Sequence, residues 1–238
     1  MVRPNFKYEK LIWKCGFNYV GGLDEAGRGA FAGPIVTGCV VFDKKSIKNF
    51  GGKEVKIDDS KRLTALQRER AYKWIKQNAL AWGVGVGTVN EINRKGIVKS
   101  TASGFRRAVR DTNNRCLHRV EYLLIDAFYI PYIGGIRMPR KNLRTRAKSK
   151  KIVKIIKGQN QQLAIVHGDT KSASIAAASI IAKVYRDNLM KKLSRNTRYA
   201  KFGWDKNKGY GTKLHRRAIR KYGVSKYHRK VYIRNYVG

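Results

Sequence analysis

The chain has 238 residues, and its 53 Lys and Arg against 15 Asp and Glu give a formal net charge of +38. This length suits one domain with an extension or two small domains, and a hydrophobic content of 42% excludes global disorder. The charge favours a nucleic-acid partner over an anionic membrane, because Lys and Arg displace phosphate counterions and the sequence offers no amphipathic or apolar membrane anchor.

The first part of the chain predicts strands with one helix between them. Residues 17–24 and 33–43 are rich in β-branched and aromatic residues and predict two consecutive strands joined by a glycine loop. A capping box at Thr64–Gln67 predicts a helix that continues to about residue 77. Residues 79–87 predict a strand whose glycines allow close packing against a helix, because their spacing does not match a dinucleotide-binding loop.

The second part alternates helices and short strands. A helical pattern covers residues 89–113, and short apolar runs at 120–126 and 162–166 predict buried strands. Residues 171–193 form the clearest helical pattern, and a final helix is expected at 213–222. The order of elements predicts an α/β fold with a mixed sheet, on which a helical C-terminal tail packs.

Two segments are strongly basic and contain no acidic residue. Residues 137–157 predict a flexible basic loop. Residues 206–238 interleave their charges with tyrosines, among them Tyr210, and this pattern favours a folded element that faces nucleic acid over a solvated face.

Cysteine and N-terminal patterns indicate a reducing compartment. Cys15, Cys39 and Cys116 are odd in number and form no C-x-x-C unit, so neither a disulfide framework nor a zinc site is expected. The N-terminal segment lacks the apolar core of a signal peptide. We therefore expect a cytoplasmic protein, and a monomer because no segment predicts oligomerisation.

Four of the scarce carboxylates stand beside predicted strand ends or helix starts. Asp24 ends the first predicted strand and Glu25 follows it, Asp126 ends an apolar strand, and Asp169 precedes the long helix. Asp169 could instead cap that helix, and Asp126 could instead pair with a Lys or Arg. Neighbours on a strand face opposite sides, so we expect the chain to bend after Asp24 if both acids serve one site.

Converging carboxylates point to divalent metal ions. Mg²⁺ and Mn²⁺ prefer oxygen ligands, and two ions about 3.5–4 Å apart can promote phosphodiester cleavage. The histidines are expected to lie apart and to be structural or to face phosphates: His118, His167, His215 and His228.

The chain resembles the ribonuclease HII (type 2 ribonuclease H) family. The match rests on four blocks in the family's order, spanning residues 19 to 229: GLDEAGRGAFAGPIVTGCVVF at 22–42, DDSKRLT at 58–64, LLIDAF at 123–128 with GDTKSASIAAASIIAKVYRD at 168–187, and FGWDKNKGYGTKLHRRAIRKYGVSKYHR at 202–229. Departures from the family pattern include Ala30 in place of a proline and Tyr199-Ala200 in place of a Tyr-Pro pair.

The resemblance implies a ribonuclease H-like mixed β-sheet flanked by helices, with a C-terminal helical extension. We expect a catalytic domain at 1–194 and a basic extension at 195–238 that packs on it and contacts substrate. The implied activity is endonucleolytic hydrolysis of the RNA strand of RNA/DNA hybrids, and cleavage 5′ of single ribonucleotides in duplex DNA, leaving 5′-phosphate and 3′-hydroxyl ends. Such an enzyme serves DNA replication and repair.

The resemblance also implies roles for individual residues. Its acidic site corresponds to Asp24, Glu25, Asp126 and Asp169, which would hold two Mg²⁺ or Mn²⁺ ions. Its glycine-arginine-glycine element corresponds to Gly27, Arg28 and Gly29, which would surround the ribose 2′-hydroxyl. Its substrate-sensing tyrosine corresponds to Tyr210, and Lys61 is a candidate phosphate contact.

Two other functions are compatible with the composition. A noncatalytic RNA-binding protein would explain the charge and the aromatic basic tail. Another nuclease of the same fold class, such as one that cuts DNA, would explain the carboxylates.

Overall fold

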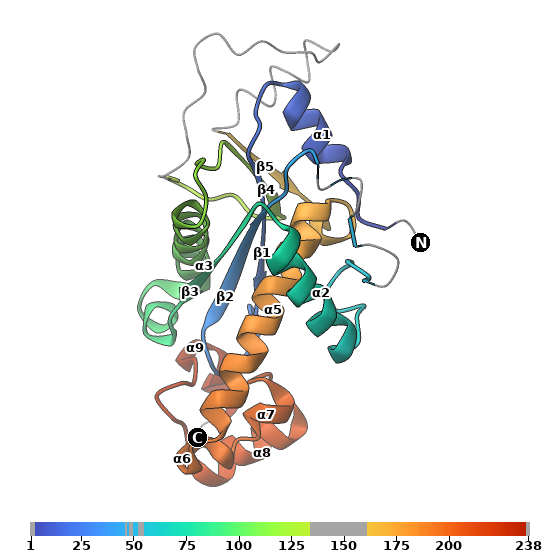
Figure 1. Ribbon diagram of the computed structural model, residues 1–238. Coiled ribbons are helices and arrows are strands. Elements are labelled where there is room, and N and C mark those ends of the chain that lie inside the picture. The colour runs from blue at the N-terminus through green and yellow to red at the C-terminus, as the bar shows by residue number, and fades with distance from the viewer. Residues whose placement is uncertain (1–2, 46, 48–49, 52–54, 134–160, 237–238) are drawn as a thin grey trace.

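The computed structural model describes residues 3–45, 47, 50–51, 55–133 and 161–236 (Figure 1). The basic segment 137–157, predicted as a loop, lies outside the described residues.

A five-stranded mixed sheet forms the centre of the fold, in the order β3-β2-β1-β4-β5. Strand β1 pairs antiparallel with β2 and parallel with β4, which in turn pairs parallel with β5. The mixed sheet agrees with the predicted fold class. The strands are β1 (Val20–Ala26), β2 (Ile35–Val41), β3 (Ala81–Gly87), β4 (Tyr122–Asp126) and β5 (Gln162–Ile165).

Helices cover both faces of this sheet (Figure 1). Helices α1, α2 and α5 share one face, α3 covers the other, and the C-terminal helices gather around the end of α5. The elements are α1 (Lys7–Lys14), α2 (Ala65–Asn78), α3 (Val89–Asn114), α5 (Ala173–Ser194), α6 (Thr197–Ala200), α7 (Trp204–Asn207), α8 (Lys213–Tyr222) and α9 (Lys230–Ile233), with the 3-10 turns η2 (Gly168–Thr170) and η3 (Arg234–Tyr236).

Helix starts follow the local signals in the sequence. The Thr64 side chain accepts a hydrogen bond from the backbone of Gln67, whose side chain accepts from the Thr64 backbone, so the predicted capping box is present. Thr88 and Glu91 form a second capping box at the start of α3. Gly96, at φ 79°, marks a kink within α3.

Helix α5 lies unusually close to the sheet because two strand positions lack side chains. A Cβ atom on Gly22 would stand 2.2 Å from the carbonyl carbon of Ser174, and one on Gly38 would stand 2.4 Å from the carbonyl oxygen of Ala178. Asp24 is opposite Gly38 in the register and two residues beyond Gly22, so its side chain points to the α5 face.

Strand β3 packs against α3 in the same way. Its glycines alternate with Val84 and Val86, and a Cβ on Gly85 would stand 1.9 Å from the Gly104 carbonyl oxygen in α3. The prediction that these glycines serve helix packing is confirmed.

Helix α1 was not predicted, and its main polar contact is with the start of α5. The carboxylate of Glu9 accepts hydrogen bonds from both the Ser172 and Ser174 hydroxyls, each at 2.6 Å, and from the Ser174 backbone at 2.9 Å. Burial raises the pKa of Glu9. The N-terminal segment therefore anchors the beginning of α5.

Two further points concern the helices. The predicted helix at 213–222 corresponds to α8, but it is not the last, because α9 follows it. None of the helices in the described part of the chain combines the length and apolar character needed to cross a membrane.

Replacing Gly85 with Ala tests the close packing of α3. The added methyl group meets backbone that cannot rotate away, so the free energy of unfolding should fall by about 1–3 kcal/mol, measured by urea denaturation. Gly29→Ala is the control, because a Cβ there meets nothing within 4 Å. Equal stability of the two variants would contradict this account of the packing.

Candidate active site

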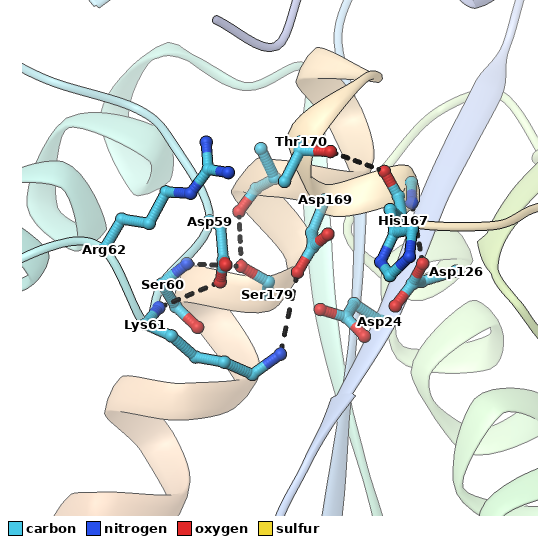
Figure 2. Close-up of polar contacts among 12 residues, drawn as sticks. Asp24, Asp59, Ser60, Lys61, Arg62, Asp126, His167, Asp169, Thr170 and Ser179 are labelled. Carbon is cyan, nitrogen blue, oxygen red and sulfur yellow. Dashed lines mark hydrogen bonds and ion pairs between the residues drawn. The ribbon is translucent and has the colours of Figure 1, made fainter. Parts of the chain in front are cut away.

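Three carboxylates from distant parts of the chain meet at the α5 face of the sheet. The parallel pairing of β1 and β4 places Leu23 beside Ile125, so the next residues are Asp24 and Asp126. One carboxylate oxygen each from Asp24, Asp126 and Asp169 lies within 4.8 Å of the other two. Figure 2 shows these side chains pointing toward one another.

The turn η2 brings Asp169 to the ends of the strands. The backbone N–H of Gly168 donates to Asp126 Oδ1 at 2.7 Å, which ties the turn to β4. Asp169 does not cap the following helix, because the side chain of Ser172 accepts the hydrogen bond from Ile175. The capping alternative considered for Asp169 is therefore wrong.

Burial and the repulsion of neighbouring carboxylates disfavour the ionised forms of Asp24 and Asp169. Burial raises the pKa of Asp24 well above 3.8, and the charges of Glu25 and Asp126 raise it further. Burial also raises the pKa of Asp169, with added repulsion from Asp59 and Asp126. A divalent cation would relieve this repulsion, and carboxylate oxygens are the donors that Mg²⁺ and Mn²⁺ prefer.

Glu25 differs from the expectation of a bend after Asp24. Strand β1 continues through Ala26, with Glu25 opposite Thr37, so the two acids leave the strand on opposite faces. Glu25 Oε1 instead stands 3.5 Å from Arg28 Nη1, and its buried Oε2 has no hydrogen-bond partner among the described residues. Burial raises the pKa of Glu25, the charge of Arg28 opposes this rise, and repulsion from Asp126 adds to it, so Glu25 is electrostatically linked to the cluster although it is not one of the three converging acids.

The 58–61 loop adds Lys61, which was predicted as a phosphate contact, and Asp59, which was not predicted as a site residue. Lys61 Nζ, on a side chain that is 78% exposed, lies 3.7 Å from Asp169 Oδ2 (Figure 2). Partial burial opposes protonation of Lys61, but the charges of Asp59, Asp169 and Asp24 outweigh it and raise its pKa. Asp59 was not singled out from the sequence. Its place in the D-D-S-K run next to Lys61 was the available signal.

Two buried arginines, Arg229 and Arg186, pack against the Gly27–Gly29 loop. Arg229 donates through Nη1 to the Arg28 carbonyl at 2.8 Å, and through Nε to the Gly33 carbonyl at 2.9 Å. Gly27 adopts φ 90°, and a Cβ there would stand 1.9 Å from Arg186 Nε, so only glycine fits. Arg28 and Gly29 are exposed, so the outer side of the loop is accessible to solvent.

Arg186 fixes the segment after this loop. It donates to the carbonyls of Ala32, Pro34 and Lys208 at 2.9–3.1 Å. Burial lowers the pKa of Arg186, and burial together with the charge of Arg186 lowers the pKa of Arg229 to about 10. The sequence analysis missed both arginines, because single basic residues do not stand out in so basic a chain.

Tyr210 is half-buried and lies on the same side as the glycine loop. The guanidinium carbon of Arg186 is 5.3 Å from the centre of its ring, and Lys183 Nζ is 5.9 Å from it. The turn before Tyr210 contacts the loop segment directly, because the Gly209 carbonyl accepts from the backbones of Phe31 and Ala32.

Two of the four histidines contact each other, which corrects the expectation that they lie apart. The Nε2 atoms of His215 and His228 are 3.2 Å apart, and both residues are buried. Residues 13 positions apart in a segment of short helices gave no periodic signal for this contact.

Comparisons with known proteins agree with the geometry. A protein-family model described as Ribonuclease HII matches residues 21–235. The Ribonuclease HII of Chloroflexus aggregans (strain MD-66 / DSM 9485) is 39% identical over 233 residues, covering 97% of this chain and 94% of that protein. The Ribonuclease HII of Clostridioides difficile (strain 630) is also 39% identical, over 229 residues, covering 96% and 75% of the two chains.

Solved structures share the fold. The crystal structure of the ribonuclease H2 from Pyrococcus horikoshii OT3 has a TM-score of 0.64 at 26% identity, covering 92% of this chain and 96% of that one. The crystal structure of Bst-RNase HIII in complex with Mn²⁺ has a TM-score of 0.61 at 21% identity, covering 90% and 65%.

Asp24→Asn should raise the thermal unfolding midpoint of the protein in chelator at pH 8. Because the folded-state pKa of Asp24 is raised, the stability linked to its proton is lost as pH rises from 3.8 through the folded pKa. The gain from the substitution should therefore shrink toward pH 4. Mg²⁺ or Mn²⁺ should stabilise the wild type but not the variant, as measured by calorimetry.

Asp111→Asn is the matched control, since Asp111 pairs with Arg115 away from the cluster. It should not raise the midpoint. A lower midpoint for Asp24→Asn in chelator at pH 8 would contradict the interpretation of the cluster as mutually repelling acids.

Proposed function

The chain belongs to the ribonuclease HII family, an enzyme family of the ribonuclease H type that acts on RNA/DNA hybrids, and from this premise we propose its detailed activity. The protein cleaves the RNA strand of a hybrid endonucleolytically. It also cuts duplex DNA 5′ to a single embedded ribonucleotide, and leaves 5′-phosphate and 3′-hydroxyl ends.

The observation that carries this proposal is the convergence of three carboxylates beside an exposed glycine loop. Asp24, Asp126 and Asp169 come from β1, β4 and η2, and their oxygens lie within 4.8 Å of one another. The net charge of +38 attracts a polyanion to the protein as a whole, and divalent cations bound by the cluster would let it approach the three acids. Metal-assisted hydrolysis of a phosphodiester needs both a group of ligands that hold the metal ions and a surface that attracts the polyanionic substrate.

The three carboxylates, with Glu25 at their border, fit a pair of Mg²⁺ or Mn²⁺ ions. The orphaned Oε2 of Glu25 supports this assignment, because a buried oxygen without a donor is a ready ligand. Two such ions would supply activation of the attacking water and stabilisation of the leaving 3′ oxygen. The protein's own contribution is to hold these acids in place through the register of β1 with β4 and the Gly168–Asp126 hydrogen bond.

The glycine loop would recognise the ribose. A 2′-hydroxyl both donates and accepts hydrogen bonds, and it is the group that distinguishes RNA from DNA. Backbone at Gly29 can approach it closely, because a Cβ there would find open space. The Arg229 hydrogen bond to the Arg28 carbonyl keeps the loop in this conformation. Because this loop begins two residues after Glu25, recognition and cleavage would act on adjacent atoms.

Tyr210 and Lys61 would complete the contacts around the scissile phosphate. The Tyr210 ring would stack on the sugar next to the ribonucleotide, with its hydroxyl near the 2′ position. Lys61 would move from Asp169 to a phosphate oxygen, since its exposed side chain allows this. The cations beside the Tyr210 ring, Lys183 and Arg186, limit the positions that the ring can take.

The remaining parts of the proposal concern organisation. Residues 1–194 would form the catalytic domain, and 195–238 a basic extension that grips the duplex beside it. The exposed side chains of Lys213, Arg217 and Arg220 on α8 support this role. We further propose that the protein acts as a monomer in the cytoplasm, in replication and repair.

A substrate panel tests the proposed activity. With Mg²⁺ or Mn²⁺, the protein should cut an RNA/DNA hybrid and a duplex with one ribonucleotide, but not an all-DNA duplex, and chelator should abolish cutting. Gel analysis of end-labelled strands should locate the single cut 5′ to the ribonucleotide. Cleavage of all-DNA duplex would favour a different nuclease, and no cleavage at all would favour a binding protein.

Removing a carboxylate tests the acidic site. Asp126→Asn and Asp24→Asn should each lower the cleavage rate by several orders of magnitude, while the dissociation constant for the hybrid, measured by fluorescence anisotropy, changes little. Asp111→Asn, in α3 beside Val84 of β3 and outside the cluster of three acids, should cleave like the wild type. Full activity of either site variant with Mg²⁺ would refute the proposed site.

Salt dependence tests the role of the extension. If the protein contacts at least about six phosphates, its affinity should fall about 10³-fold or more between about 50 mM and about 200 mM salt. A variant with Gln at positions 213, 217 and 220 should lower the slope of log K against log salt by about 0.9 for each lost contact. An unchanged slope would place the duplex elsewhere.

A further inference from the structure

The buried histidine pair shows one consistent arrangement of hydrogens. The Ser225 backbone N–H donates to His228 Nδ1 at 2.8 Å, so Nδ1 is an acceptor and the ring hydrogen of neutral His228 is on Nε2. That hydrogen faces His215 Nε2 at 3.2 Å, which also accepts from Trp204 Nε1 at 3.1 Å. His215 must therefore carry its hydrogen on Nδ1.

The histidine pair is also hydrogen-bonded to the backbone of Tyr210. His215 Nδ1 lies 2.9 Å from the Tyr210 carbonyl oxygen, to which it donates. The imidazoles are 0% and 2% exposed, so neither can contact a nucleic acid directly. Burial lowers the pKa of both histidines, that of His228 to about 4, with the charge of His215 adding to the effect, so both rings are neutral near pH 7.

The other end of the pair is attached to the segment after the glycine loop. The backbone of His228 forms an isolated antiparallel bridge with Ala32, and the Arg229 N–H donates to the Phe31 carbonyl at 2.8 Å. On the opposite side, Phe31 and Ala32 donate to the carbonyl of Gly209, the residue before Tyr210. The segment 31–32, which follows the glycine loop, therefore contacts the backbone at Gly209 on one side and at His228 and Arg229 on the other. The hydrogen bonds of the histidine pair connect these two sides.

We propose that the neutral His215–His228 pair positions Tyr210 relative to the Gly27–Gly29 loop. This inference rests on the proposed function, in which these two elements contact the same ribonucleotide. The pair does not touch substrate. It fixes the position of the Tyr210 backbone through the hydrogen bond from His215 Nδ1 to the Tyr210 carbonyl. A displacement of about 1 Å in a substrate-contacting group can slow a reaction by about 10²-fold, even when the mutated residue lies away from the reacting atoms.

Variants of His215 separate positioning from stability. His215→Phe keeps a ring but loses the donor to Tyr210, whereas an amide nitrogen in His215→Asn can replace Nδ1. His215→Phe should lower the single-turnover rate on the single-ribonucleotide duplex by about 10-fold to about 10²-fold with little change in binding. His215→Asn should recover most of that loss.

Trp204→Phe is the matched control. It removes the other donor to His215 Nε2 but leaves the bond to Tyr210 intact. It should lower the unfolding midpoint and retain the cleavage rate. Equal rate losses in Trp204→Phe and His215→Phe would overturn the proposal, because they would show that general packing is responsible.

A double-mutant cycle with Tyr210→Ala decides whether the effect passes through Tyr210. If His215 acts by positioning that tyrosine, adding His215→Phe to Tyr210→Ala should slow cleavage no further. Multiplicative losses would overturn the proposal, as would a Tyr210→Ala variant with the wild-type rate. In the latter case hybrid cleavage by the wild type would still support the proposed function, whereas a wild type that cuts nothing would refute both.

The hydrogen positions can be measured without any variant. Nitrogen-15 NMR of the wild-type imidazoles at pH 7 should show hydrogen on Nδ1 of His215 and on Nε2 of His228. The reverse tautomers, or a doubly protonated ring, would overturn the proposal even if His215→Phe failed to fold.

Discussion

The close approach of α5 to the sheet is the constraint on which the rest of the structure depends. Gly22 and Gly38 lack side chains where the helix backbone passes, so the helix starts directly above the carboxyl end of β4. That start includes the turn with Asp169, which Glu9 and its serine contacts help to anchor. The acidic site is therefore a consequence of backbone packing: three acids meet because one helix lies close to two strands.

Charge is distributed in the interior in two opposite ways. The carboxylates Asp24 and Asp169 are buried beside one another and repel, so their pKa values rise and the cluster favours a cation. Arg186 and Arg229 are buried as well, but they donate to backbone carbonyls, Arg186 to that of Pro34 and Arg229 to those of Gly33 and Arg28, whereas Arg229 Nη2 has no partner among the described residues. The buried carboxylates thus repel one another, whereas the buried arginines support the backbone of the Gly27–Gly29 loop and of the segment after it.

Local sequence signals predicted most of the helices and strands. They could not predict contacts between residues that are far apart in the sequence. The Thr64 capping box and the alternating glycines of β3 specify their own surroundings, and both predictions are confirmed. The continuation of β1 past Asp24 depends on pairing with β2, and the His215–His228 contact depends on how short helices fold back. The roles of the site residues come from the family resemblance; the geometry places three of the acids together, whereas Glu25 leaves β1 on the opposite face from Asp24.

The arginine contacts also determine which features of the sequence the conformation of the glycine loop requires. Along residues 28–34, the hydrogen bonds from Arg186 and Arg229 go to backbone carbonyl oxygens, and every amino acid supplies a carbonyl. These hydrogen bonds therefore set no requirement on the loop side chains, although Gly27 and Gly33 are restricted to glycine by their positive φ angles and their close neighbours. The Gly27–Gly29 loop thus depends on two arginines that are distant in the sequence, and another scaffold would need counterparts of both to hold it in the same conformation.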